Sequence, residues 1–286
     1  MEIDTTRDPR SPGTQGWCFG LPPGITLEQW PLDPHSGYPL CHAFTLLLPD
    51  DHRVHGPDVV GLSFFSVAAE HNDGGPISTP GLNDTILRPS ELPPENRTLS
   101  DFWTHAANQH PKLYRMTDIL GCAYAVILLS EAEYDGPFCN VPDLVHHPLL
   151  EDTPTPGWVS LDPSSVWMDM YGASSENRKL AGTDHDTRLK ASSLAFTAVP
   201  RPNDPNAGKS VTDPTYASKF TENFEWKDWA KNLGTNHIGG TMDAVQQAPD
   251  FGPCYIGFDE FFGGMNFGGG TAQFDFKDMK FDWACG

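Results

Sequence analysis

Residues 253–286 read PCYIGFDEFFGGMNFGGGTAQFDFKDMKFDWACG, with aromatic side chains placed between clusters of glycine. Burial of aromatic rings offsets the chain entropy lost on folding, so this density of rings indicates a closely packed segment rather than a disordered tail. Three short strands fit the segment, at 254–258, 271–276 and 280–285. The latter two alternate apolar and polar residues in places, as half-buried antiparallel strands do, and the glycines supply the turns.

A helix is expected directly upstream of these strands, at residues 221–233. Lysines lie toward its end, and Gly234 follows in the position where helices commonly terminate. Its apolar side chains recur mostly at helical spacing: Phe224, Trp226, Trp229, Ala230 and Leu233.

Four apolar runs of strand length lie farther upstream, at residues 42–48, 59–67, 122–130 and 193–199. The first two are nearly continuous in apolar character, which favours a sheet covered on both faces; a strand or a buried helix fits the third. A short helix is expected from 101 to about 109, because Pro111 prevents its continuation. These elements predict an α+β fold with mixed or antiparallel sheets, few short helices and many loops.

The polar residues 1–16 are expected to form a flexible arm, followed by a single α+β domain over 17–286. Any seam within that domain is expected in the proline-rich loop at 200–214. A proline- and cysteine-containing corner precedes a predicted strand twice, at 37–42 and at 252–255. A duplicated unit would produce such a repeated motif.

Several glycine and proline corners lie near the two ends of the chain: Trp30-Pro31, Gly37-x-Pro39-Leu40, His237-x-Gly239-Gly240 and Gly268-Gly269-Gly270 with Cys285 beyond. Together with the strands at 44–48 and 62–65, these corners resemble the YwqG-like family of bacterial proteins over residues 20–67 and 233–286. The resemblance implies a compact α+β fold with a mixed or antiparallel sheet. It implies no reaction, because the function of that family is unknown, and it suggests an association with bacterial toxin and immunity neighbourhoods.

The formal net charge of −20 is the strongest bulk signal. It argues against nucleic acid and anionic membranes as partners, because both require a cationic surface. A basic protein partner suits it, since opposite charge steers association. No apolar run is long enough to cross a bilayer, and the first residues do not form a secretory signal, so a cytoplasmic location is expected. The six cysteines contain no Cys-x-x-Cys pair, and most are expected to be buried thiols.

The residues that could carry chemistry are scattered, and none has the spacing of a known catalytic motif. We expect no cofactor, because the triple glycine at 268–270 lacks the lysine of a phosphate loop. Asp101 and His105 are interpreted as a pair on a helix surface. The weak metal candidates are Asp184, His185 and Asp186. The acids that could meet a basic partner are Asp259, Glu260, Asp275, Asp278 and Asp282, for which a solvated sheet face is the alternative.

We therefore predict a non-enzymatic, acidic binding protein with a basic protein partner, and a toxin-neutralising immunity protein fits that description. One alternative is a hydrolase that uses carboxylates or a metal near the glycine-rich C-terminal segment. Another is a glycan-binding or structural module, since some of the eight tryptophans could line a groove. The sequence leaves the oligomeric state open.

Overall fold

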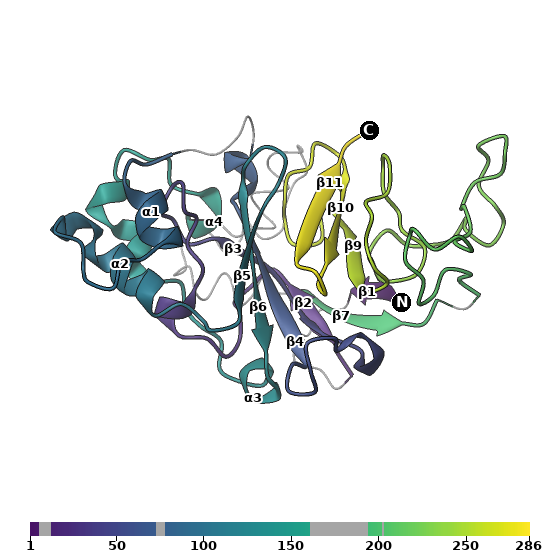
Figure 1. Cartoon of the computed structure of the whole chain (residues 1–286), viewed down its shortest axis with the longest axis horizontal. Coiled ribbons are helices and arrows are strands. Elements are labelled where there is room, and N and C mark those ends of the chain that lie inside the picture. The colour runs from purple at the N-terminus through teal and green to yellow at the C-terminus, as the bar shows by residue number, and fades with distance from the viewer. Residues whose placement is uncertain (6–12, 73–77, 161–193, 202) are drawn as a thin grey trace.

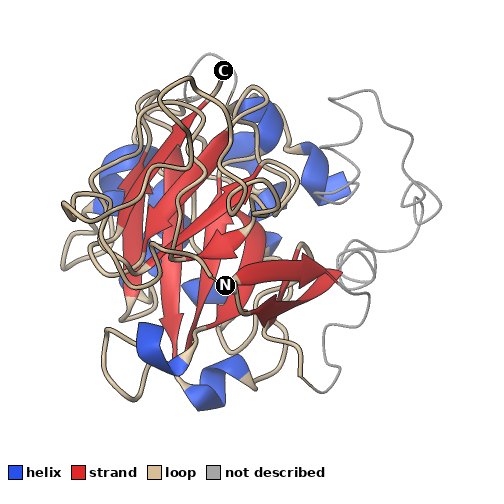
Figure 2. Cartoon of the chain, turned by 90° about the vertical axis from the view of Figure 1, so that its right-hand side faces the viewer, coloured by secondary structure: helices blue, strands red, loops and turns tan. Residues whose placement is uncertain are grey.

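The computed structural model of the chain describes residues 1–5, 13–72, 78–160, 194–201 and 203–286 (Figure 1). Its strands form one eleven-stranded sheet in the order β11-β10-β9-β8-β1-β7-β2-β3-β4-β6-β5, and every ladder is antiparallel. The predicted α+β fold with antiparallel strands and short helices is confirmed. Figure 2 shows the strands gathered in the middle of the molecule and most helices at its periphery.

The strands are short, and the helices are one or two turns long. The strands are β1 Glu2–Thr5, β2 Gly16–Cys18, β3 Cys41–Leu47, β4 Gly61–Ser66, β5 Leu113–Thr117, β6 Ala123–Leu129, β7 Leu194–Val199, β8 His237–Ile238, β9 Tyr255–Asp259, β10 Thr271–Asp275 and β11 Lys280–Ala284. The helices are α1 Leu82–Leu87, α2 Ser100–Ala107, α3 Glu131–Tyr134 and α4 Gly157–Ser160, with 3-10 turns η1 Leu27–Gln29, η2 Asp50–His52, η3 Ala69–His71, η4 Arg97–Leu99, η5 Asp143–His146 and η6 Pro148–Leu150.

Six expected strands are confirmed as β3, β4, β7, β9, β10 and β11, and the helix expected from residue 101 is α2. The run at 122–130, which fitted a strand or a buried helix, is the strand β6. The two corners at 37–42 and 252–255 lead into β3 and β9. One expectation needs correction at the N-terminus. Residues 2–5, within the expected flexible arm, form β1, which pairs with β7 on one side and β8 on the other. Main-chain hydrogen bonds to the neighbouring strands hold this segment in place, and its polar side chains do not predict those bonds.

The helix expected at 221–233 is wrong. Phe224 has a left-handed backbone (φ 60°) and an 86% exposed side chain, so the chain turns back where a helix would continue. Phe220 pairs with Trp226 across this turn, with ring centroids 4.8 Å apart. The ammonium of Lys219 lies 5.0 Å from the Trp226 ring centre, within reach of a cation–π interaction. Ring contacts across a turn therefore account for aromatic spacing that resembled a helix face.

The two halves of the sheet pack against each other around one cluster of phenylalanines. Phe64 of β4 lies between Phe44 of β3 (5.1 Å between ring centroids) and three rings of the C-terminal strands. Those rings are Phe258 of β9 at 5.8 Å, Phe274 of β10 at 5.4 Å and Phe281 of β11 at 5.6 Å. The N-terminal and C-terminal strands therefore share a single core.

The two edges of the sheet also meet. Nε1 of Trp283 in β11 donates to Oδ2 of Asp118, 3.0 Å away, in the loop between β5 and β6. The other oxygen of Asp118 accepts the backbone N–H groups of Leu120 and Cys122, both at 2.9 Å. This carboxylate ties the last strand of the chain to the opposite edge of the sheet.

The corner at residues 239–242 is held by the loop that follows β7. Asp204 accepts hydrogen bonds from the N–H (2.8 Å) and hydroxyl (2.6 Å) of Thr241. Gly240 has φ 80°, and a Cβ added there would clash with Oδ2 of Asp204. The described part of the loop at 200–214, where we expected any seam, is thus fixed to the sheet by the Asp204 carboxylate.

Gly240→Ala should therefore lower the free energy of unfolding by more than the about 1–2 kcal/mol that a left-handed alanine costs. Gly208→Ala is the matched control, because Gly208 also has a positive φ (72°) but nothing within 4 Å of the added Cβ. Urea unfolding of both variants checks this. If both variants lose the same free energy of unfolding, Asp204 moves away from the added Cβ without an energetic cost.

Candidate functional site

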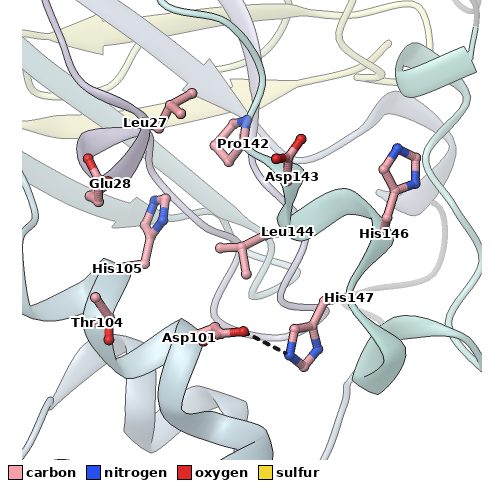
Figure 3. A pocket seen from close by; sticks show the side chains of 10 residues that line it. All are labelled: Leu27, Glu28, Asp101, Thr104, His105, Pro142, Asp143, Leu144, His146 and His147. Atoms are coloured by element: carbon pink, nitrogen blue, oxygen red, sulfur yellow. Dashed lines mark ion pairs between the residues drawn. The ribbon is translucent and has the colours of Figure 1, made fainter.

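A cavity of about 320 Å³ opens between η1, α2 and η5. Figure 3 shows that three separate stretches of the chain form its walls. Leu27 and Glu28 lie on one side, the α2 residues lie below, and the 142–147 segment lies opposite. We call this cavity the acidic groove. The described residues that line it are Leu27, Glu28, Asp101, Thr104, His105, Pro142, Asp143, Leu144, His146 and His147.

Three carboxylates line the acidic groove, and no described lysine or arginine does. Glu28, Asp101 and Asp143 each occupy the first turn of a short helical element, where exposed N–H groups favour negative charge. For Glu28, a backbone hydrogen bond and a second one with the Thr26 side chain lower the pKa of the carboxyl. Glu28 is therefore ionised at neutral pH.

His105 adds a neutral acceptor to the groove. Its side chain projects from α2 and is 7% exposed. Nε2 lies 2.5 Å from the carbonyl oxygen of Trp30, so this nitrogen carries the proton and donates. Burial lowers the pKa of the imidazole, although the Trp30 bond opposes the shift. Nδ1 then holds a lone pair and has no hydrogen-bond partner among the described residues.

This placement corrects the interpretation of Asp101 and His105 as a helix-surface pair. Asp101 instead lies near His147, with Oδ2 3.6 Å from Nε2 of that ring. Nδ1 of His147 accepts the backbone N–H of Leu149 (3.1 Å), which leaves the proton on Nε2. The ring also packs edge-on against Phe102, 4.7 Å between centroids. The backbone thus engages Nδ1 of His147, and Nε2 faces the Asp101 carboxylate.

Two of the acids proposed for partner binding are buried and bind the backbone. Glu260, 5% exposed, accepts the N–H groups of Phe267 and Gly269 (the latter 2.9 Å), which fixes the glycine-rich loop before β10. Asp275, 1% exposed, accepts the N–H of Gly252 at 3.0 Å and those of the turn after β10. Their carboxylates are therefore turned into the fold.

The remaining three proposed acids are spread over the β9–β11 hairpins. Asp259 ends β9, where burial raises the pKa of its carboxyl and the N–H of Phe262 donates to it at 3.0 Å. Asp282 lies on β11, and burial raises the pKa of this carboxyl as well. Asp278 is on the surface, 3.6 Å from the ammonium of Lys280. The structure does not bring the five acids into one patch, because Asp259 and Asp275 stand at opposite ends of the β9–β10 ladder.

The described residues contain no group of three or more His, Cys, Asp or Glu side chains that could hold a metal ion. The weak candidates Asp184, His185 and Asp186 lie outside the described residues. Five of the six cysteines are buried, as expected, and all six are free thiols. Burial raises the pKa of Cys122 to about 12, so this thiol is not a nucleophile at neutral pH.

No family model, curated protein or solved structure matches the chain. In the part of the chain that the structure describes, none of the helices has the length and apolar character needed to traverse a bilayer. The acidic groove was not predicted because its walls come from residues 27–28, 101–105 and 142–147. Each wall is unremarkable in sequence, and only the fold brings their carboxylates together.

Proposed function

We propose that the protein is a non-enzymatic, acidic binding protein whose acidic groove takes a lysine or arginine side chain of a basic protein partner. The observation that carries this proposal is the groove's inventory of polar groups. Glu28, Asp101, Asp143 and Nδ1 of His105 accept, and the described lining contains no lysine or arginine; Nε2 of His147, 3.6 Å from Asp101, is a donor in the same groove. Such a set is complementary to an ammonium or guanidinium group, which can only donate.

The electrostatics support the same partner. Glu28, Asp101 and Asp143 are all exposed, so their attraction for a cation comes from their arrangement around one cavity and is screened by salt. Leu27, Pro142 and Leu144 provide apolar surface for the methylene stem of a lysine or arginine. The net charge of −20 would steer a basic protein toward the molecule from a distance. In the toxin and immunity setting that the YwqG-like resemblance implies, the partner would be a basic toxin.

Binding of a defined cationic peptide tests the proposal. Hexalysine, titrated calorimetrically at low ionic strength, should bind the wild-type chain and should bind more weakly as salt is raised. The triple variant Glu28→Gln, Asp101→Asn, Asp143→Asn should bind hexalysine at least about tenfold more weakly than wild type. Tenfold corresponds to a loss of about 1.4 kcal/mol of binding free energy.

The matched control is Glu91→Gln, Glu95→Gln, Glu222→Gln, which removes the same charge from exposed acids outside the groove. The control should retain most of the wild-type affinity. If the two triple variants lose affinity equally, binding depends only on net charge, and the groove has no part in it. Circular dichroism of both variants separates lost binding from lost folding.

A further inference from the structure

A second cavity, of about 440 Å³, lies between α1, the turn at residues 33–38 and the β5–β6 hairpin. We call it the Arg115 cavity. Its walls combine apolar side chains with a few polar ones, as small-molecule sites commonly do. The described residues that line it are Pro34, His35, Asn83, Leu87, Arg115, Met116, Thr117, Gly121, Ala123 and Tyr124.

Arg115 forms no ion pair with any residue that the structure describes. Nη1 donates to the carbonyl oxygen of Leu32 at 2.8 Å, and this is the guanidinium's one hydrogen bond among the described residues. Burial lowers the pKa of the side chain to about 10, so it stays charged at neutral pH. A guanidinium has five N–H donors, and most of those of Arg115 have no acceptor in the described part of the protein.

The nearest candidate for a counter-ion is already engaged. Asp33 influences Arg115 electrostatically, but it forms no ion pair with it. One oxygen of Asp33 accepts the N–H of His35 at 3.0 Å. The other accepts the N–H (3.2 Å) and hydroxyl (2.5 Å) of Ser36. Asp33 therefore shapes the turn at 33–38 and leaves most of the Arg115 donors without an acceptor among the described residues.

Three other polar side chains line the cavity without a hydrogen-bond partner in the described residues: His35, Asn83 and Thr117. The apolar part of the wall is formed by Leu87, Met116 and Ala123. Arg115 is half-buried, and a guanidinium with free N–H groups is stabilised by a bidentate carboxylate, which fits its planar fork. The neighbouring hydroxyl and amide can donate to the same anion.

We propose that the Arg115 cavity binds a carboxylate attached to a small apolar group, either a free carboxylic acid or the C-terminus of a peptide that ends in an apolar residue. The carboxylate lies against the Arg115 guanidinium, within reach of Asn83 and Thr117. The apolar group packs against Leu87, Met116 and Ala123. This site is separate from the acidic groove, takes a ligand of opposite charge, and does not depend on the function proposed for the groove.

Calorimetric titration of the full chain with hexanoate and with 3-phenylpropanoate tests the site. Each should show saturable one-to-one binding, while hexanamide and 3-phenylpropanamide should bind at least about tenfold more weakly, since they lack the charge. Arg115→Met should reduce carboxylate affinity to a similar extent. An acetylated tripeptide ending in leucine, compared with its amide, distinguishes the two sources: tighter binding of the tripeptide than of hexanoate points to a protein C-terminus.

A second pair of variants keeps the test decisive if Arg115→Met folds poorly. Leu87 is 43% exposed, so substitutions there leave the core intact. Leu87→Glu places a carboxylate beside the guanidinium and should weaken hexanoate binding about tenfold or more relative to Leu87→Gln, which has the same shape without the charge. The proposal is overturned if neither acid binds saturably, if amides bind as well as acids, or if Leu87→Glu and Leu87→Gln bind alike.

Discussion

Replacing Phe64 with alanine should lower the free energy of unfolding by about 3–5 kcal/mol, the range for deleting a buried phenylalanine ring. The Phe64 side chain is 0% exposed. Its ring contacts Phe44 on its own half of the sheet and Phe258, Phe274 and Phe281 on the other. The substitution therefore removes transfer energy and leaves a cavity where the two halves meet. Such a loss is a large fraction of the about 5–15 kcal/mol that stabilises a typical domain.

Phe224→Ala is the matched control, because it deletes the same ring from a site that is 86% exposed. Its effect should stay within about 0.5 kcal/mol. Urea unfolding followed by tryptophan fluorescence and by far-ultraviolet circular dichroism measures both variants. If Phe64→Ala proves as mild as Phe224→Ala, the halves of the sheet do not share a core.

The sequence predicted the strands that follow simple rules of burial. The run at 122–130 became β6, and all seven residues of β6 are buried, so its apolar character is continuous. Residues 280–285 became β11, whose Phe281 and Trp283 face the core rings while Asp282 lies between them. In both cases the pattern of apolar side chains within the strand itself indicates its burial.

The turn at 220–226 shows why other elements were predicted incorrectly. Its aromatic spacing fits a helix, but the left-handed Phe224 and the Phe220–Trp226 contact decide its conformation. Propensity is a weak prior that tertiary contacts override. The strand β1 was missed for the converse reason, because its order comes from pairing with β7 and β8 rather than from apolar residues.

The two candidate cavities could not be predicted, because their polar groups are far apart in sequence. Glu28 and Asp143 meet in the acidic groove across more than a hundred residues, and Arg115 meets Asn83 in its cavity across two elements. No spacing rule connects such positions. The sequence does contain the sum of the charges, and the net charge of −20 predicts a cationic partner without indicating any particular surface.

Buried neutral histidines should make the protein sensitive to acid, and His42 should contribute most clearly. Its side chain is 1% exposed. Nδ1 lies 3.2 Å from the Phe19 carbonyl oxygen and donates to it, so Nε2 accepts from the Thr45 hydroxyl at 2.9 Å. His42 and Thr45 reach each other because the ladder shifts register between His42 and Phe44, a bulge with no sequence signal.

Burial lowers the pKa of His42 from its usual 6.5 to about 3. The folded state therefore stays neutral at this site while the unfolded state takes up a proton below about pH 6.5. The stability is fully present above pH 6.5 and is lost as pH falls toward 3. Between pH 7 and pH 4 the loss from His42 alone should be about 3 kcal/mol, since each pKa unit corresponds to about 1.4 kcal/mol. Burial also lowers the pKa of His237, which adds a loss of the same sign.

Urea unfolding of wild type and His42→Gln at pH 7, 6, 5 and 4 tests this directly. The variant should be less stable at pH 7, because the His42 hydrogen bonds and packing are lost, but its stability should fall less steeply with acid. By pH 4 the gap should have narrowed by about 3 kcal/mol. His146→Gln is the control, because it makes the same substitution at an exposed position. If the free energy of unfolding falls equally with pH in wild type and His42→Gln, then His42 is protonated in the folded protein as easily as in the unfolded chain. That result would contradict the lowered pKa of His42.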